Sequence, residues 1–153
     1  MDEDKEKYSR PYILSIEDNP EDFEIIARAL RKVAPQRRIQ HCESGDDALQ
    51  FLRQHQEAPV DGLGLPDVIL LDLNLPGTDG RDILKIIKND QKLQRIPVIV
   101  FSTSNNEKDI EVSYTSGANA YLRKPSTLEE FVDIAQTINK FWFDTCLVSR
   151  NNP

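Results

Sequence analysis

The chain is poor in cysteine and histidine, and its net charge is not positive. It contains Cys42, Cys146, His41 and His55 in 153 residues. Two cysteines so far apart predict neither a disulfide framework nor a zinc site. The histidines have no ligand-like neighbours, so we interpret both as ordinary surface or core residues. The net charge of −7 disfavours nucleic acid as a partner, because neutralising phosphates requires a basic surface.

Long apolar runs are also missing. No stretch approaches the roughly 20 apolar residues that cross a bilayer, and the charged start lacks the apolar segment of a signal peptide. We therefore expect no membrane partner and a cytoplasmic location. Residues 1–10 are interpreted as a disordered tail. The remaining length suits one domain with a complete core, expected over residues 11–143, followed by a C-terminal tail over 144–153 that is a candidate interface segment.

The chain does contain a regular alternation of short apolar strands and amphipathic helices. Strands are predicted at residues 12–16, 39–42, 68–71, 97–101 and 120–122, and a helix follows each. Alternation of this kind predicts an α/β fold with a parallel sheet and helices on both faces. Unbroken aliphatic runs such as 68–71 are typical of strands buried on both faces. Five strands and five helices predict a doubly wound sheet, for which 2-1-3-4-5 is a common strand order.

Capping signals mark where several of these helices begin. Asn19 before Pro20 predicts one start, and Thr127 with Glu130 forms a capping box at another. Either Thr78 or Asp79 is expected to cap the third helix. Residues 105–116 differ, because that segment is polar and offers few apolar side chains for burial, so it predicts a weakly anchored helix.

Charged and hydroxyl side chains follow four of the predicted strands: Glu17-Asp18, Asp72, Ser102 and Lys124. The carboxyl ends of parallel strands meet at one edge of the sheet, where ligands bind in open α/β folds. Three carboxylates in one cleft repel one another unless a hard cation neutralises them, and oxygen ligands suit Mg²⁺. Because bound Mg²⁺ commonly recruits substrate phosphate, the pattern predicts phosphoryl chemistry.

Each residue of this set has a role in such chemistry. Asp72 can act as a nucleophile that forms an aspartyl-phosphate. Lys124 supplies a positive charge for phosphoryl oxygens, and Ser102 supplies a hydrogen-bond donor. Taken alone, each residue also fits a simpler role, such as a helix cap, a loop hydroxyl or a solvated lysine. Their joint position at four strand ends favours the functional interpretation.

These motifs resemble the receiver domain of two-component response regulators. The resemblance covers about residues 10–140, and its motifs are 13–18 (ILSIED), 69–76 (ILLDLNLP) with Asp79-Gly80, 97–102 (PVIVFS), Gly117-Ala118 and 121–125 (YLRKP). It implies the flavodoxin-like receiver fold and a signalling protein that is not an enzyme beyond its own phosphorylation and dephosphorylation. A histidine kinase or a phosphotransfer domain would phosphorylate Asp72 to 4-aspartylphosphate.

The same resemblance implies roles for the surrounding residues. Asp18, Asp72 and the backbone carbonyl of Asn74 would bind Mg²⁺, and Glu17 would contribute through water. Lys124 would pair with the phosphoryl group, and its bond to Pro125 is often cis in this family. Ser102 and Tyr121 match the hydroxyl and the aromatic residue that switch together on phosphorylation.

The sequence departs from the commonest family pattern at three positions. Glu17 replaces the more frequent Asp, and Ser102 replaces the more usual Thr. Thr103 stands where a small residue such as Ala is usual, which implies altered access to the phosphoryl group and an altered rate of its hydrolysis.

A narrower resemblance links the chain to single-domain receivers that partner bacterial and cyanobacterial phytochromes, through 74–77, 102–107 and 141–143. It implies a phytochrome-type histidine kinase as the partner. No basic helix pair follows Phe143, so output is expected through protein contact or onward phosphotransfer. The aromatic cluster Phe141-Trp142-Phe143 either packs the last helix onto the sheet or forms an interface. A homodimer through the last strand, the last helix and this cluster is expected.

Other functions fit the sequence less well. Phosphatases with an aspartate nucleophile, such as those resembling the haloacid dehalogenase group, carry a second acid two residues later, where this chain has Asn74. A flavodoxin-type phosphate loop is excluded by the acidic run 17–22, and a calcium loop lacks its later ligands. A phosphorylation-independent adaptor is disfavoured because acceptor, metal acids, hydroxyl and lysine are all present. A phosphotransfer intermediate in a longer relay remains an alternative.

Overall fold

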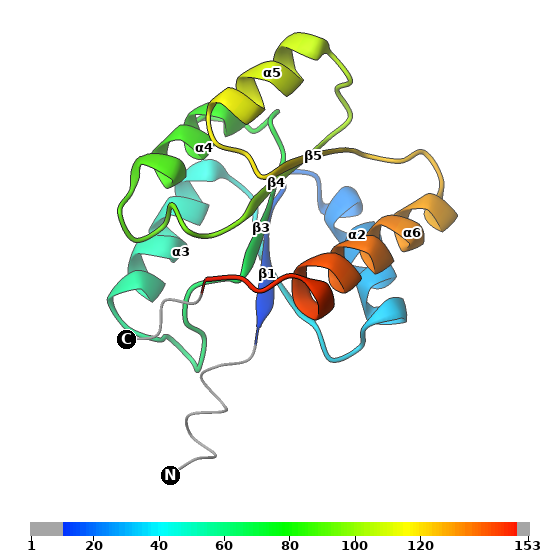
Figure 1. Ribbon diagram of the computed structural model, residues 1–153, viewed down its shortest axis with the longest axis horizontal. Helices are drawn as coiled ribbons and strands as arrows, with labels where there is room; N and C mark the ends of the chain where they lie inside the picture. The colour runs from blue at the N-terminus through cyan, green and yellow to red at the C-terminus, as the bar shows by residue number, and fades with distance from the viewer. Residues whose placement is uncertain (1–10, 150–153) are drawn as a thin grey trace.

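The computed structural model describes residues 11–149 as a three-layer α/β domain (Figure 1). Its elements are β1 (Tyr12–Ile16), α2 (Pro20–Val33), β2 (Arg38–Cys42), α3 (Gly45–Glu57), β3 (Val68–Leu71), α4 (Gly80–Asn89), β4 (Val98–Ser102), α5 (Glu107–Thr115), β5 (Ala120–Arg123), α6 (Leu128–Asn139) and the π-helix η1 (Lys140–Thr145). All strand pairs are parallel, and the strand order is β2-β1-β3-β4-β5. The predicted fold class is confirmed.

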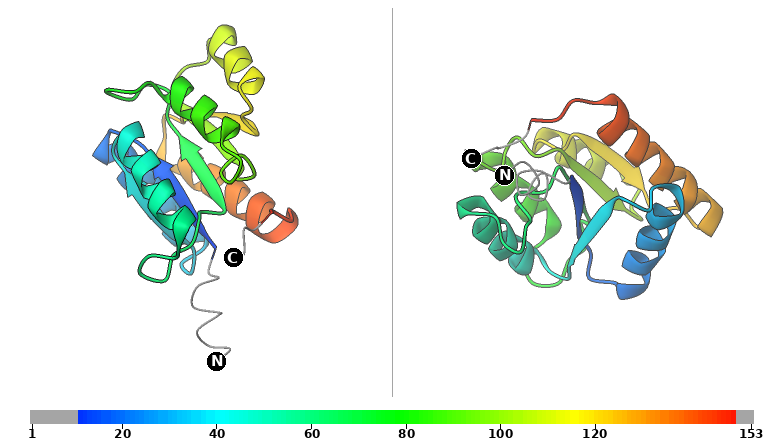
Figure 2. Two further views of the ribbon diagram at one scale, coloured as in Figure 1. Left: turned by 90° about the vertical axis from the view of Figure 1, so that its left-hand side faces the viewer. Right: turned by 90° about the horizontal axis from the view of Figure 1, so that it is seen from below.

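Two groups of helices cover the two faces of the sheet. Helices α3, α4 and α5 lie on one face, and α2 and α6 lie on the other (Figures 1 and 2). Alternate residues of each strand point to opposite faces. In β3, Ile69 and Leu71 pack with α3 and α4, whereas Val68 and Leu70 pack with α2 and α6. This two-sided burial explains why the strands are unbroken apolar runs.

Side-chain caps begin the helices at the predicted positions. Asn19 accepts hydrogen bonds from the backbone of Glu21 and Asp22, and Thr127 accepts one from Glu130. At the start of α4 the cap is Asp79, not Thr78. These caps fix where α2, α4 and α6 begin relative to the ends of β1, β3 and β5, the strands that precede them.

Helix α5 is weakly anchored, as its sequence predicts. Ser113 is the one buried side chain among its described residues, and Tyr114 is half exposed. Helix α3 extends to Glu57 and includes the buried His55. Neither His41 nor His55 joins a cluster of acids; they stack on Phe23 and Phe51.

The structure describes only part of the two predicted tails. The tail predicted over 1–10 and the last four residues of the tail predicted over 144–153 lie outside the described residues. The predicted start of that second tail falls inside η1 (Lys140–Thr145). Within residues 11–149, no helix is both long enough and apolar enough to cross a membrane.

Candidate functional site

The ends of β1, β3 and β5 bring acids and a lysine together. The Nζ atom of Lys124 lies 2.5 Å from Oε1 of Glu17 and 3.1 Å from Oδ2 of Asp72. It also donates to Oδ2 of Asp22, in the first turn of α2, at 3.0 Å. The sequence singled out Glu17, Asp72 and Lys124 for this edge, and the fold brings all three into contact. Asp22 was missed, because an acid in the first turn of a helix is already favoured by the helix dipole.

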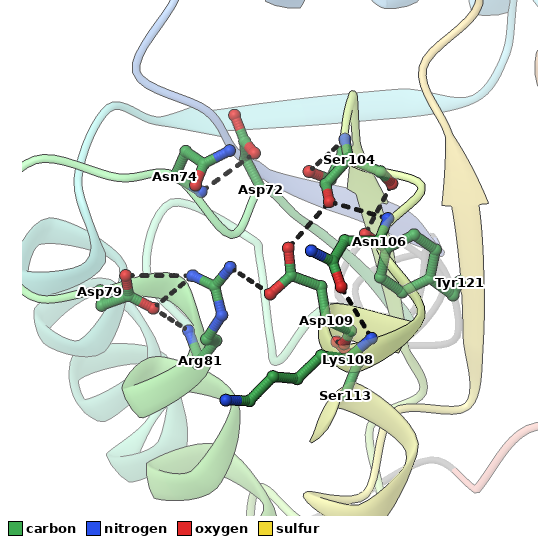
Figure 3. A network of polar contacts seen from close by, with 11 residues as sticks. Asp72, Asn74, Asp79, Arg81, Ser104, Asn106, Lys108, Asp109, Ser113 and Tyr121 are labelled. Carbon is green, nitrogen blue, oxygen red and sulfur yellow. Dashed lines mark hydrogen bonds and ion pairs between the residues drawn. The ribbon is translucent and has the colours of Figure 1, made fainter. Parts of the chain in front are cut away.

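Asp72 is held in place by its own backbone and by α4. Its N–H donates to the carbonyl oxygen of Ile16 at 3.1 Å, and its Oδ1 accepts the N–H of Asn74 at 3.2 Å (Figure 3). Gly80, the first residue of α4, donates its N–H to the carbonyl oxygen of Leu73 at 3.0 Å. A Cβ atom at Gly80 would lie 2.2 Å from the carbonyl oxygen of Asp72. The helix can therefore approach this backbone so closely only because it begins with glycine.

Three of the acids are arranged as a set of cation ligands. Glu17, Asp18 and Asp72 each offer one oxygen, and these oxygens lie within 4.8 Å of one another. The Oε2 atom of Glu17 is buried and has no hydrogen-bond partner among the described residues. An unsatisfied buried acceptor is unfavourable, and a hard divalent cation coordinated by these oxygens removes that cost. The residues present therefore fit a divalent metal ion.

Burial and neighbouring charges shift the pKa values of Glu17 and Lys124. Burial and the neighbouring carboxylate of Asp72 raise the pKa of Glu17 from 4.5 to about 9, against the opposing effect of Lys124. Burial also lowers the pKa of Lys124, but its bond to Glu17 and the charge of Asp72 outweigh that effect and raise it overall. Lys124 is therefore the fixed cation of the site, and in the metal-free protein the Glu17 carboxyl binds a proton more readily than a free carboxyl does.

We expect the metal-free protein to lose stability as the pH rises from about 5 to about 9. Because the pKa of Glu17 is higher in the folded state, the folded protein binds more protons than the unfolded chain in this range. The free energy of unfolding then falls with pH, by at most about 1.4 kcal/mol per unit for one group. Urea unfolding in EDTA measures this slope. Glu17→Gln should flatten it, and Glu111→Gln, exposed on α5, should not; equal slopes in wild type and Glu17→Gln would contradict the assignment.

The predicted hydroxyl and aromatic residues both contact Ser104. Ser102 is fully buried, and its Oγ accepts the N–H of Ser104 at 3.3 Å. The hydroxyl of Tyr121 donates to the carbonyl oxygen of Ser104 at 2.8 Å (Figure 3). Thr103, which lies between Ser102 and Ser104 in the sequence, is exposed. One loop residue thus joins the two side chains for which the family resemblance implies a joint movement.

Ser104 also begins a polar chain to α4. Its hydroxyl donates to Oδ2 of Asp109 at 2.8 Å, and Oδ1 of Asp109 accepts from Nη2 of Arg81 at 2.7 Å. Arg81 also pairs with Asp79, the cap of α4, at 3.1 Å (Figure 3). The bond to Asp109 is the main cause of the raised pKa of Arg81. Since α5 buries so little, these polar contacts hold its first turn beside α4. Sequence reasoning missed Ser104, Arg81 and Asp109.

Two further expectations concern Pro125 and the aromatic cluster. All peptide bonds among residues 11–149 are trans, so the cis form that is frequent in the family at Pro125 is absent here. In η1, Trp142 and Phe143 pack against the apolar cluster of α2 and α6, and the Arg37 guanidinium lies 4.0 Å above the Phe143 ring. Phe141 remains 50% exposed. Both interpretations of the cluster therefore hold in part: two rings pack inward and one faces outward.

A doubly wound parallel sheet with an acid–lysine cluster at its carboxyl edge defines a class of α/β proteins built for anionic ligands and hard cations. The chain matches the family model of the response regulator receiver domain over residues 13–136. It therefore belongs to the response regulator receiver domain family, whose members are signalling domains of two-component systems.

Two sequence relatives align over most of this chain. Response regulator Rcp1 of Synechocystis sp. is 38% identical over 133 residues, covering 87% of this chain and 89% of that protein. The probable methanogenesis regulatory protein FilR2 of Methanothrix harundinacea is 36% identical over 130 residues, covering 85% and 82%.

Solved structures agree with these sequence relatives. The phosphorylated cyanobacterial phytochrome response regulator RcpA is 38% identical, with a TM-score of 0.83 and coverage of 93% of this chain and 100% of that one. The Mn²⁺-bound form of Rcp1 is 36% identical, with a TM-score of 0.80 and coverage of 92% and 99%. This chain is thus similar in sequence and fold to phytochrome response regulators.

Proposed function

We propose that this chain accepts a phosphoryl group from a histidine kinase on Asp72, with Mg²⁺ bound by Glu17, Asp18 and Asp72 and by the backbone carbonyl of Asn74. The observation that carries the proposal is the position of Asp72, one of whose oxygens lies 3.1 Å from the Lys124 ammonium. The same carboxylate belongs to the acid cluster that fits a cation. A nucleophile, a fixed cation and a metal site thus share one carboxyl group.

The protein groups around Asp72 account for the steps of the transfer. A carboxylate oxygen of Asp72 attacks phosphorus, and the bond from phosphorus to the donor breaks, with the electron pair leaving on the donor. The metal ion, when bound, neutralises the charge on the phosphoryl oxygens. Lys124 exchanges its bond to Asp72 for one to a phosphoryl oxygen, and the buried hydroxyl of Ser102 donates to another.

Movement of Ser102 would then pass to the surface through Ser104. A hydroxyl that turns toward the phosphoryl group gives up the N–H of Ser104, and the carbonyl of Ser104 is the partner of Tyr121. Helix α5 follows at little cost, because few of its side chains are buried. Phosphorylation would therefore shift the population between two arrangements of the loop and α5.

Similarity to phytochrome response regulators supports a phytochrome-type histidine kinase as the donor. The names of those relatives describe their own signalling, and the partner of this chain follows by analogy. A phosphotransfer domain in a longer relay is the alternative donor. Rates of transfer from purified kinases of both kinds would separate the two.

Acetyl phosphate with Mg²⁺ should label the protein with one phosphoryl group. The group should be lost in hydroxylamine, because an acyl phosphate is attacked there and a serine phosphate is not. Intact-mass spectrometry measures the incorporation. Replacing Mg²⁺ by EDTA should abolish it, since the carboxylates then repel the incoming phosphate. Equal labelling in EDTA would contradict the proposed metal-dependent acceptor.

We also propose a homodimer that uses the exposed face of α6 and η1. Phe141 is the aromatic side chain of the cluster that stays exposed, and exposed aromatic residues are enriched in interfaces. Sedimentation at micromolar concentration should give a dimer for wild type and a monomer for Phe141→Ala. Ile86→Ala, 40% exposed on α4, is the control and should remain dimeric. Monomeric wild type, or dissociation by Ile86→Ala alone, would refute this interface.

A further inference from the structure

Lys124 has one acid partner that lies outside the predicted metal and acceptor site. A lysine ammonium has three N–H donors, and in this structure they serve Glu17, Asp72 and Asp22. The side chain of Lys124 is 7% exposed and that of Asp22 is 32% exposed. The third donor is therefore directed toward the rim of the site rather than toward its centre.

Unlike Glu17 and Asp72, the other two partners of Lys124, Asp22 does not belong to the predicted metal site. The acids whose oxygens gather within reach of one cation in the described chain are Glu17, Asp18 and Asp72. Asp22 instead lies in the first turn of α2, where the helix N-terminus stabilises its negative charge and its N–H is capped by Asn19. Asp22 is not one of the acids grouped for a cation. A cation bound by the other three acids therefore need not displace the 3.0 Å contact between Asp22 and Lys124.

We propose that Asp22 is a positioning residue that holds Lys124 back from the phosphoryl group and so limits the affinity of the site for it. This inference rests on the proposed function. A phosphoryl group on Asp72 needs N–H donors from Lys124, and the donor given to Asp22 is not available to it. The same carboxylate adds negative charge beside an incoming anion. Asp22 thereby keeps the phosphorylated state from becoming too stable to be discharged.

Beryllofluoride, a non-covalent mimic of the phosphoryl group, tests this directly. At saturating Mg²⁺, Asp22→Asn should bind beryllofluoride about two- to fivefold more tightly, the range for a charge pair that is partly exposed. Without the mimic, the same variant should bind Mg²⁺ more weakly, because one anion is lost and Lys124 is freed to pair with the metal ligands. Amide NMR titrations measure both affinities in the full chain.

Glu21→Gln is the matched control. Glu21 carries the same charge in the same turn of α2 but is exposed, so both affinities should stay at the wild-type values. Opposite changes for the anion and the cation are the signature of Asp22 acting on the charge of the site. A variant that merely loosens the structure would weaken both.

The outcomes separate this inference from the function on which it rests. If wild type binds beryllofluoride and Asp22→Asn binds it equally or less tightly, the role of Asp22 is refuted and the acceptor site stands. The same holds if Glu21→Gln reproduces the effect. If wild type fails to bind the mimic with Mg²⁺ present, the proposed function fails and the inference falls with it.

Discussion

Asp72→Asn will take up no phosphoryl group from acetyl phosphate, whereas Asp82→Asn will be labelled like wild type. The amide has nearly the shape of the carboxylate and can still accept the N–H of Asn74, which now bonds to Oδ1. It is not a nucleophile of the kind that forms an acyl phosphate. Asp82 lies exposed in the first turn of α4, so its replacement removes the same charge away from the cluster. Intact mass after incubation with Mg²⁺ gives the answer.

The loss in Asp72→Asn should not come from unfolding. Asp72 is one of the groups that raise the pKa of Glu17, so its replacement relieves repulsion in the metal-free site. We expect its midpoint of thermal unfolding in EDTA to be equal to or above that of wild type. Full labelling of the folded variant would remove Asp72 from the acceptor position.

Gly80→Ala should be the most destabilising single-methyl change at the site. The added Cβ would lie 2.2 Å from the carbonyl oxygen of Asp72 and 2.7 Å from Cα of Leu73. Both are backbone atoms, which cannot rotate away as a side-chain tip can, so α4 or the end of β3 must shift. Overpacking of this kind costs about 3 kcal/mol of the free energy of unfolding. Urea unfolding at pH 7 measures the loss.

Gly64→Ala is the matched control, because a Cβ there meets nothing within 4 Å in the described chain. Its stability should stay within about 0.5 kcal/mol of wild type. In the folded fraction of Gly80→Ala, the displaced backbone moves Asp72 relative to Lys124, so phosphorylation should also be slower. Wild-type stability together with wild-type labelling would mean that α4 can shift freely, and that Gly80 does not set the position of Asp72.

The fold was predictable because its signals are local. Each strand is an apolar run, and each helix begins at a residue such as Asn19 or Thr127 whose side chain caps it. The meeting of Glu17, Asp72 and Lys124 also followed from sequence, since parallel strands end at one edge.

The missed contacts depend on distances that no local pattern encodes. Arg81 and Asp109 are 28 residues apart, and their pairing requires α4 and α5 to begin side by side. Asp22 carries no distinguishing signal, because an acid in a first helical turn is common for other reasons. The π-helix η1 differs from an α-helix by one residue in its hydrogen-bond register, and apolar periodicity does not reveal such a difference.

Because α5 buries so little of its surface, its sequence can change more freely during evolution than that of the other helices. Ser113 is the one buried side chain among the described residues of this helix, so most of its surface is free of packing constraints. Substitutions on that surface change the free energy of unfolding little, while they alter the shape and charge presented to another protein. Duplicated copies of such a protein can therefore evolve different binding partners through substitutions on α5, while the buried residues of the phosphoryl-acceptor site stay the same.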